Sequence, residues 1–91
     1  NNIPINSALL SSYPNPFNPV ATVGYDLAEA GLIELSVFNS AGKQIQTLVK
    51  SFQTAGAHQI SFNGQSLPAG TYILRLETAG QAQMQKVLLL K

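Results

Sequence analysis

The sequence predicts an all-β fold, an antiparallel β-sandwich of about seven strands. Turn-forming residues recur at short intervals along the 91 residues, and the runs between them are rich in Val, Ile, Leu, Tyr and Thr. A spacing of about ten residues for each strand and its turn is typical of such sandwiches. No long stretch keeps a helical period. The strands are expected over residues 7–13, 20–27, 32–39, 43–50, 57–62, 70–78 and 82–90.

The connection between the first two expected strands is the most distinctive stretch of the chain, Tyr13-Pro14-Asn15-Pro16-Phe17-Asn18-Pro19. Each proline fixes its own φ, removes a backbone donor and pushes the preceding residue towards extended geometry, which excludes a helix or an interior strand. Asn15 and Asn18 can bond to nearby backbone, as in turns. We expect a rigid turn that Tyr13 and Phe17, four residues apart, both anchor on the core.

The middle strands alternate between apolar and polar side chains, so each should offer one face to a core. The residues expected to face inward are Ala21, Val23, Tyr25 and Leu27, then Ile33, Leu35 and Val37, then Tyr72, Leu74 and Leu76. Those expected to face outward are Thr22, Gly24 and Asp26, then Glu34, Ser36 and Phe38, then Thr71, Ile73, Arg75 and Glu77. Arg75 and Glu77 are expected to pair, and an exposed pair contributes only about 0–1 kcal/mol.

The last strand departs from this alternation. Its apolar residues fall on both faces, Val87 and Leu89 on one and Met84, Leu88 and Leu90 on the other. Either the strand is buried on both sides, or one face is left uncovered for a partner, and we favour the second. The hypothesis is that residues 82–91 dock onto a receptor strand by β-augmentation. An uncovered last strand could also pair with a second copy and form a dimer.

Composition argues against several classes of function. Charged residues are 10% of the chain and the net charge is +1, against about 25% charged residues in a typical domain. The cations are spread along the chain, so no basic stripe is available for nucleic acid: Lys43, Lys50, Arg75, Lys86 and Lys91. Without cysteine there is no disulfide framework and no thiolate zinc site. The longest apolar run, residues 87–90, is too short to span a bilayer.

No catalytic or metal-binding pattern is present among the titratable residues. The single histidine, His58, shares parity with Ile60 and Phe62 and is expected to cap the edge of the core rather than to bind a ligand. The acids lie apart and none has a general-acid partner or a nucleophile beside it. We therefore expect no enzyme and no cofactor. A calcium site built from Asp26, Glu29 and backbone carbonyls stays open, although such sites usually use more carboxylates.

Five stretches, in this order, resemble the C-terminal sorting domain of the type IX secretion system of Gram-negative bacteria. Besides Tyr13–Pro19, they are Val37–Lys43 with its Gly42, Ala55-Gly56-Ala57-His58, Leu67-Pro68-Ala69-Gly70-Thr71-Tyr72 and Lys86-Val87-Leu88-Leu89-Leu90-Lys91. The resemblance covers roughly residues 9–91 and implies an immunoglobulin-like sandwich. Residues 1–8 would then be the end of a linker from an upstream cargo. By position, the family's recognition motif falls on Leu67–Tyr72 and on Lys86–Lys91.

The resemblance implies a domain without catalysis, carried at the end of a larger exported protein. Such a cargo enters the periplasm through an N-terminal signal peptide, and the outer-membrane translocon then recognises the sorting domain. A sortase-like peptidase usually removes the domain, and the cargo is released outside the cell or attached to surface lipopolysaccharide. The partners implied are therefore the translocon, the peptidase and the covalently linked cargo.

The sequence departs from the family pattern at a few positions. Ser12 stands where Asn is frequent, Asn39 where Asp is usual, Phe62 where Trp is common, and the final lysines are spaced one residue wider. These departures leave the fold intact and bear on cleavage and terminal recognition. The alternative function is an immunoglobulin-like structural, adhesive or glycan-contacting module of a secreted multidomain protein. Five aromatics are expected inside or anchored, which leaves Phe38 and Phe52 for a glycan: Tyr13, Phe17, Tyr25, Phe62 and Tyr72.

Overall fold

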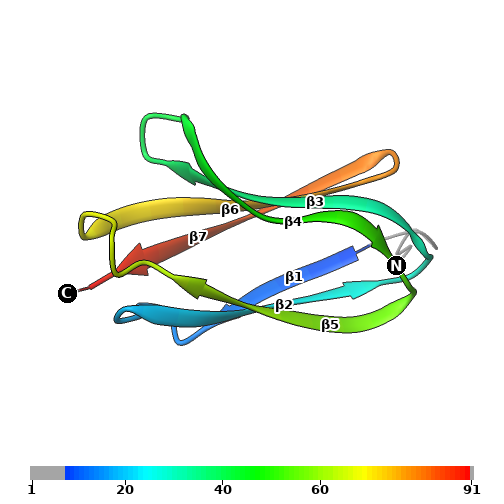
Figure 1. Ribbon diagram of the computed structural model, residues 1–91, viewed down its shortest axis with the longest axis horizontal. Coiled ribbons are helices and arrows are strands. Elements are labelled where there is room, and N and C mark those ends of the chain that lie inside the picture. Colours follow the sequence, from blue (N-terminus) through cyan, green and yellow to red (C-terminus); the bar gives the residue numbers. More distant parts are fainter. Residues whose placement is uncertain (1–7, 91) are drawn as a thin grey trace, which may run out of the picture.

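The computed structural model describes residues 8–90 as two antiparallel sheets packed face to face (Figure 1). The strands are β1 (Ala8–Tyr13), β2 (Val20–Leu27), β3 (Gly31–Asn39), β4 (Gln44–Gln53), β5 (Gly56–Asn63), β6 (Gly70–Thr78) and β7 (Gln81–Leu89). One sheet has the order β1-β2-β5 and the other the order β4-β3-β6-β7. The predicted seven-strand sandwich is confirmed.

The expected strand bounds differ mainly at β4, which continues to Gln53 because it pairs with β3 as far as Gly31. Its register against β3 shifts after Leu35 and again after Val37, which marks bulges in this edge pair. Residue 7 of the first expected strand, residues 1–7 of the expected linker 1–8, and Lys91 lie outside the described residues; Ala8 opens β1.

The core lies between the two sheets and comes from alternate positions of the strands, as the alternation predicted. All ten residues expected to face inward from β2, β3 and β6 are buried, and four more join them: Phe17, Phe62, Val87 and Leu89. The rings of Phe17 and Phe62 meet with their centroids 5.3 Å apart. Phe17 therefore anchors the proline segment on the core, and its packing stabilises the connection between β1 and β2.

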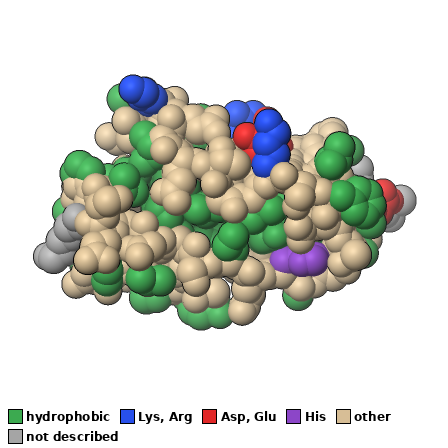
Figure 2. All heavy atoms as spheres, viewed as in Figure 1, with side chains coloured by type: hydrophobic (Ala, Val, Ile, Leu, Met, Phe, Trp, Pro, Cys, Tyr) green, Lys and Arg blue, Asp and Glu red, His purple; other side chains and the backbone are tan. Residues whose placement is uncertain are grey.

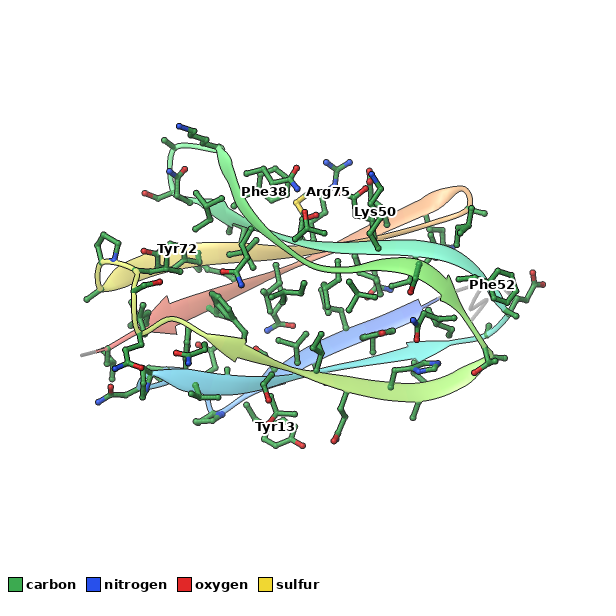
Figure 3. The ribbon with its side chains drawn as sticks, viewed as in Figure 1. Tyr13, Phe38, Lys50, Phe52, Tyr72 and Arg75 are labelled. Carbon is green, nitrogen blue, oxygen red and sulfur yellow. The ribbon has the colours of Figure 1, made fainter. Side chains whose placement is uncertain are left out.

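Tyr13 does not anchor the segment, and this part of the prediction is wrong. The Tyr13 side chain is 53% exposed, and its hydroxyl accepts a hydrogen bond of 3.1 Å from Gln59 on the outer surface (Figure 3). The reason is the alternation of β1, in which Leu10 packs against the core and a residue three positions later faces outward. One aromatic ring, not two, holds the turn.

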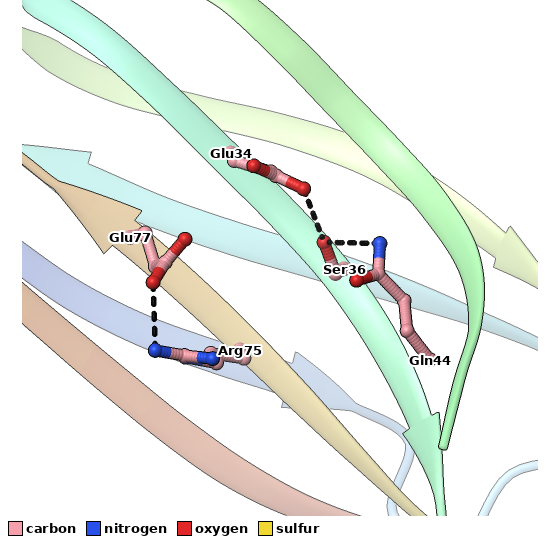
Figure 4. Close-up of polar contacts among 5 residues, drawn as sticks. All are labelled: Glu34, Ser36, Gln44, Arg75 and Glu77. Carbon is pink, nitrogen blue, oxygen red and sulfur yellow. Dashed lines mark hydrogen bonds and ion pairs between the residues drawn. The ribbon is translucent and has the colours of Figure 1, made fainter.

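Ser36 is a second correction, because it is buried rather than directed to solvent. It lies on the outer face of β3, a central strand with neighbours on both sides. The Ser36 hydroxyl donates to Glu34 and accepts from the Gln44 amide, both at 3.2 Å (Figure 4). These longer side chains cover the serine and satisfy its hydroxyl, so its burial carries no unpaired polar group.

The face of the molecule shown in Figure 2 carries few charged side chains. Arg75 and Glu77 form the expected ion pair, with a nitrogen–oxygen distance of 2.6 Å (Figure 4). The Arg75 guanidinium also lies 6.0 Å from the centre of the Phe38 ring, and both side chains are partly covered. Residues 8–90 include no helix with the length and apolar character needed to cross a membrane.

Candidate functional site at one end of the sandwich

The two stretches expected to carry recognition are neighbours in the structure. Residues 70–72 open β6 and residues 87–89 close β7, and the register pairs Gly70 with Leu89 and Tyr72 with Val87. Antiparallel pairing of consecutive strands brings the start of one beside the end of the next. Both stretches therefore lie at the end of the sandwich where β7 finishes, next to the C mark in Figure 1.

The proline segment forms the third member of this site, on the other side of β7. Phe17 makes an isolated parallel bridge to Leu89. Its N–H donates to the Leu88 carbonyl at 2.9 Å, and its carbonyl accepts from the Leu90 N–H at 2.8 Å. A single residue of the segment thus behaves as a very short strand beside the last one.

Asn15 extends this pairing with its side chain. The Asn15 Nδ2 donates to the Lys86 carbonyl at 3.0 Å, and the Asn15 Oδ1 accepts from the Leu88 N–H at 3.1 Å. The amide side chain therefore makes the two hydrogen bonds that a peptide group of a neighbouring strand would make. Asn15 and Phe17 together form hydrogen bonds with four backbone groups on this edge of β7, the Lys86 and Leu88 carbonyls and the Leu88 and Leu90 N–H groups.

This finding corrects the expectation that the whole stretch 82–91 presents a free edge to a receptor strand. From Lys86 to Leu90 the edge is already paired. Only the earlier part of β7, residues 81–85, lacks a strand partner on this side within residues 8–90. An incoming strand would have to displace Asn15 and Phe17 to reach the last residues of β7.

The burial of the β7 side chains decides between the two interpretations of this strand, which were burial on both faces or burial on one. Val87 and Leu89 are fully buried in the core, whereas Leu88 is 38% and Leu90 45% exposed. Lys86, two positions before Leu88 and on the same face of the strand, is also exposed. The strand is thus buried on one face only, and its other face, continued by Leu90, offers three large apolar side chains, Met84, Leu88 and Leu90, and the cation Lys86.

The loop before β6 is fixed by a buried tyrosine. The Tyr72 hydroxyl donates to the Pro68 carbonyl at 2.5 Å, an arrangement similar to the tyrosine corner of immunoglobulin-like domains. Leu67 packs partly against the core, while Pro68 and Ala69 are exposed. A shallow groove of about 300 Å³ runs along this loop. Tyr72 therefore positions the loop.

Gly64 is a further member of this site, which the sequence marks only by a turn signal, the Asn63-Gly64 dipeptide. Its N–H donates to the Pro19 carbonyl at 2.8 Å. A Cβ atom placed on Gly64 would lie 2.8 Å from the Leu89 side chain and 3.5 Å from the Phe17 ring. The absence of a side chain at residue 64 lets the proline segment and the last strand meet; the Asn-Gly dipeptide was its only sequence signal.

The other family motif residues lie outside this site. Gly42 has a φ of 86° in the β3–β4 turn, a conformation that favours glycine, and the Asn39 side chain accepts from the Ala41 and Lys43 N–H groups there. Gly56 opens β5 with a φ of 113°. His58 stacks on Tyr25 at 5.2 Å and its Nε2 lies 2.7 Å from the Thr54 carbonyl, so it borders the core as expected.

Among residues 8–90 the structure offers no cluster of three or more metal-binding side chains, and the calcium hypothesis for Asp26, Glu29 and backbone carbonyls stays a prediction. Glu34 and Glu77 lie on the outer face of the four-stranded sheet. The groups that cluster at the site are backbone amides, prolines and aliphatic side chains, which suit recognition by contact.

The comparison with known families agrees with the position of these motifs. A family described as the secretion system C-terminal sorting domain matches residues 11–90, which include the proline segment, the Tyr72 loop and β7. No curated protein matches the chain. Members of this family are sorting signals rather than catalysts, and they direct the exported proteins that carry them to the secretion machinery. The chain belongs to the secretion-system C-terminal sorting domain family and is a sorting signal for type IX secretion to the cell surface or the extracellular space.

Proposed function

We propose that the outer-membrane translocon recognises the folded sandwich through the exposed side chains at the site, and not through a free strand edge. The exposed residues assigned to contact are Pro68, Ala69, Lys86, Leu88 and Leu90. Leu67 and Gly70 flank them in the same loop, and Lys91, outside the described residues, is assigned by its place in the family's motif. The observation that carries the proposal is the exposure of Leu88 and Leu90 on a strand whose edge is occupied by Asn15 and Phe17. Apolar side chains left uncovered beside a cation are typical of contact surfaces.

Three buried residues of the motifs have a supporting role in this proposal. Tyr72 holds the Pro68 loop, and Val87 and Leu89 fix β7 on the core. Their substitution would impair export through misfolding, whereas substitution of the exposed residues would impair export of a folded domain. This difference separates positioning from contact.

The remaining steps follow the family. We propose that the cargo lies upstream of a linker ending near residue 8, reaches the periplasm through an N-terminal signal peptide, and is separated from this domain by a sortase-like peptidase. The domain itself has no catalytic role in this scheme. The aromatics left for a glycan, Phe38 and Phe52, belong to the same sheet, but Phe38 pairs in register with Gln44 and Phe52 with Leu32, towards opposite ends of the β3–β4 pair (Figure 3). This separation does not favour the single flat aromatic face that a glycan-binding module would use.

A dimer through the last strand remains a prediction, now restricted to residues 81–85 of β7. The side chains of Gln81, Gln83 and Gln85 are partly covered and alternate with exposed positions. Polar residues directed inward at an edge oppose pairing with another sheet. We therefore expect such a dimer only at high concentration, detectable as a concentration-dependent sedimentation coefficient.

Export of a reporter fused to residues 1–91, in cells with and without the translocon, tests the proposed contact surface. The double variant Lys86→Gln/Leu88→Thr removes the cation and one apolar side chain while keeping Val87 and Leu89 in the core. We expect export to fall about tenfold, equivalent to about 1.4 kcal/mol of binding free energy. Met84→Thr is the matched control, because Met84 is a 70% exposed residue on the same face of the same strand.

Cooperative thermal unfolding of each purified fusion shows whether the variants fold. Full export of a folded Lys86→Gln/Leu88→Thr protein would contradict the proposal. Equal loss of export in the Met84→Thr control would also count against it, since the contact would then not be confined to this end of the strand.

A further inference from the structure

A second apolar surface lies on the outer face of the β3–β4 pair. Leu32 and Phe52 are direct cross-strand partners, and they are 73% and 62% exposed. They line an open groove of about 880 Å³, larger than the groove of about 300 Å³ beside the Tyr72 loop. Large apolar side chains that meet on a surface mark an interaction site more often than scattered ones do.

This groove lies at the opposite end of the sandwich from the proposed recognition surface. Figure 3 places Phe52 at one end and Tyr72 at the other. The register explains the position: Gly31 pairs with Gln53 beside the groove, and Leu27 pairs with both Ala8 and Gly56 at that end of the other sheet. The described chain therefore begins, at Ala8, at the end that carries Leu32 and Phe52.

The charges at the groove indicate what kind of surface would fit. Glu34 and Glu77 are direct cross-strand partners on one face, where like charges repel. Glu77 has Arg75 as an ion-pair partner. Glu34 accepts a hydrogen bond from Ser36 and pairs in register with Lys50. Lys50 also lines the groove, so each of the two carboxylates at its rim has a cation beside it. An apolar floor with a rim of balanced charge suits an apolar side chain and favours neither sign of charge.

The family limits the choice of partner. A C-terminal sorting domain is joined to its exported protein through its N-terminal side, so the upstream protein is tethered at the end that carries the groove. A tether of this kind raises the effective concentration to the millimolar range, at which even a small contact is occupied.

We propose that the Leu32–Phe52 groove docks the surface of the exported protein that precedes it, with an apolar side chain of that protein against Leu32 and Phe52. The proposal depends on membership of the family and not on which surface the translocon recognises. It assigns the two ends of the sandwich to different partners, the cargo at one and the secretion machinery at the other.

Hydroxyl-radical footprinting of the complete exported protein tests this docking. The comparison is a fusion in which an unrelated reporter replaces the natural upstream protein and residues 1–91 are unchanged. Met84, 70% exposed and on β7, is an internal reference for radical dose. We expect labelling of Phe52, relative to Met84, to be several-fold lower in the exported protein than in the reporter fusion.

Variants separate the apolar contribution from the ionic one. We expect docking to raise the thermal stability of the domain in the exported protein above that in the reporter fusion. Leu32→Thr/Phe52→Thr should abolish this increase, whereas Glu34→Gln/Glu77→Gln, which leaves the apolar floor in place, should keep most of it. Val20→Thr, a 43% exposed aliphatic residue on the other sheet, is the matched control and should change nothing. Export of the Leu32→Thr/Phe52→Thr protein is expected to continue, so loss of docking and loss of recognition are distinguished.

Equal Phe52 labelling in the two proteins would overturn the proposal. Protection of Phe52 in both would overturn it as well, because it would assign the groove to residues 1–7 of this chain or, if it depended on concentration, to a second copy. Protection confined to the natural protein, and lost with the Leu32→Thr/Phe52→Thr variant, is the supporting result.

Discussion

The Tyr25 phenol is buried in the core, where its ring stacks on His58. Burial raises the pKa of Tyr25 above its usual value of 10.0. Because the folded state holds this proton more tightly, the phenol contributes fully to the free energy of unfolding below the pKa that Tyr25 has in the unfolded chain. This contribution is lost as pH rises to the higher pKa of the folded state. We expect Tyr25→Phe to remove this part of the alkaline destabilisation while changing little at pH 7.

Urea unfolding at neutral pH and at about pH 11, above the ordinary tyrosine pKa, checks this expectation. Tyr13→Phe, at an exposed tyrosine, should keep the alkaline loss of the parent protein. If Tyr25→Phe lost as much stability above pH 10 as the parent, the titration of Tyr25 would not be its source.

Gly64 is the residue at which a single added methyl group should have the largest effect on the site. An alanine Cβ would lie 2.8 Å from Leu89, which is fully buried and cannot move outward. Overpacking of this kind typically costs about 1–3 kcal/mol. We expect Gly64→Ala to lower the free energy of unfolding by that amount in urea titrations. Gly31→Ala, where a Cβ would meet nothing within 4 Å, should be tolerated far better.

The link between the proline segment and β7 depends mainly on Asn15 and Phe17. Asn15→Leu keeps the approximate size of the side chain and removes both of its hydrogen bonds to β7. Such exposed bonds contribute about 1 kcal/mol together. We expect hydrogen exchange at the Leu88 amide to become several-fold faster, and exchange at the Leu90 amide, which Phe17 pairs, to rise less.

Asn18→Leu is the matched control for this prediction, because within residues 8–90 no hydrogen bond joins the Asn18 side chain to β7. Unchanged exchange at Leu88 in Asn15→Leu would mean that the proline segment does not protect the edge. Faster exchange at Leu88 with no change in the core amide of Leu74 would localise the effect to this link.

The sequence predicts an element well where the interactions that form it join residues close together in the chain, and poorly where they join distant residues. Alternation within β2, β3 and β6 is local, and it gave the correct inward faces. The pairing of Asn15 with Lys86 and Leu88 joins residues more than 70 positions apart, and no local pattern indicates it. Tyr13 was misplaced for a similar reason: its spacing from Phe17 was clear, but the inward parity of β1 depends on how that strand packs against the other sheet.

The candidate site was only partly predictable for the same reason. The resemblance identified the Leu67–Tyr72 and Lys86–Lys91 stretches, but it did not distinguish the residues available for contact from the residues buried in the core. Burial separates them: Tyr72, Val87 and Leu89 are interior, while Pro68, Ala69 and Leu88 are exposed. Gly64 carried only a turn signal, because its close approach to Leu89 exists only once the sheets have packed.

The whole domain depends on its last strand, and this limits what a deletion can reveal. Removing Lys86–Lys91 takes Val87 and Leu89 out of the core, a loss of about 3–6 kcal/mol at about 1.5–3 kcal/mol for each buried side chain. It also removes the pairing partners of Asn15 and Phe17. Against a total stability of about 5–15 kcal/mol for a folded domain, the fold of the truncated chain should be marginal or lost.

We therefore expect a reporter fused to residues 1–85 to lose both its export and the cooperative unfolding transition of the domain. Lys86→Gln/Leu88→Thr should fail in export alone, because it leaves the core residues of β7 in place. Circular dichroism melting curves of both fusions, measured beside export, distinguish the two outcomes. A truncated fusion that unfolds as cooperatively as the parent would show that β7 contributes little to the core, and the loss of its export could then be assigned directly to recognition. The expected coupled loss instead means that the same strand closes the sandwich and presents the signal, so only substitutions on its exposed face can separate folding from sorting.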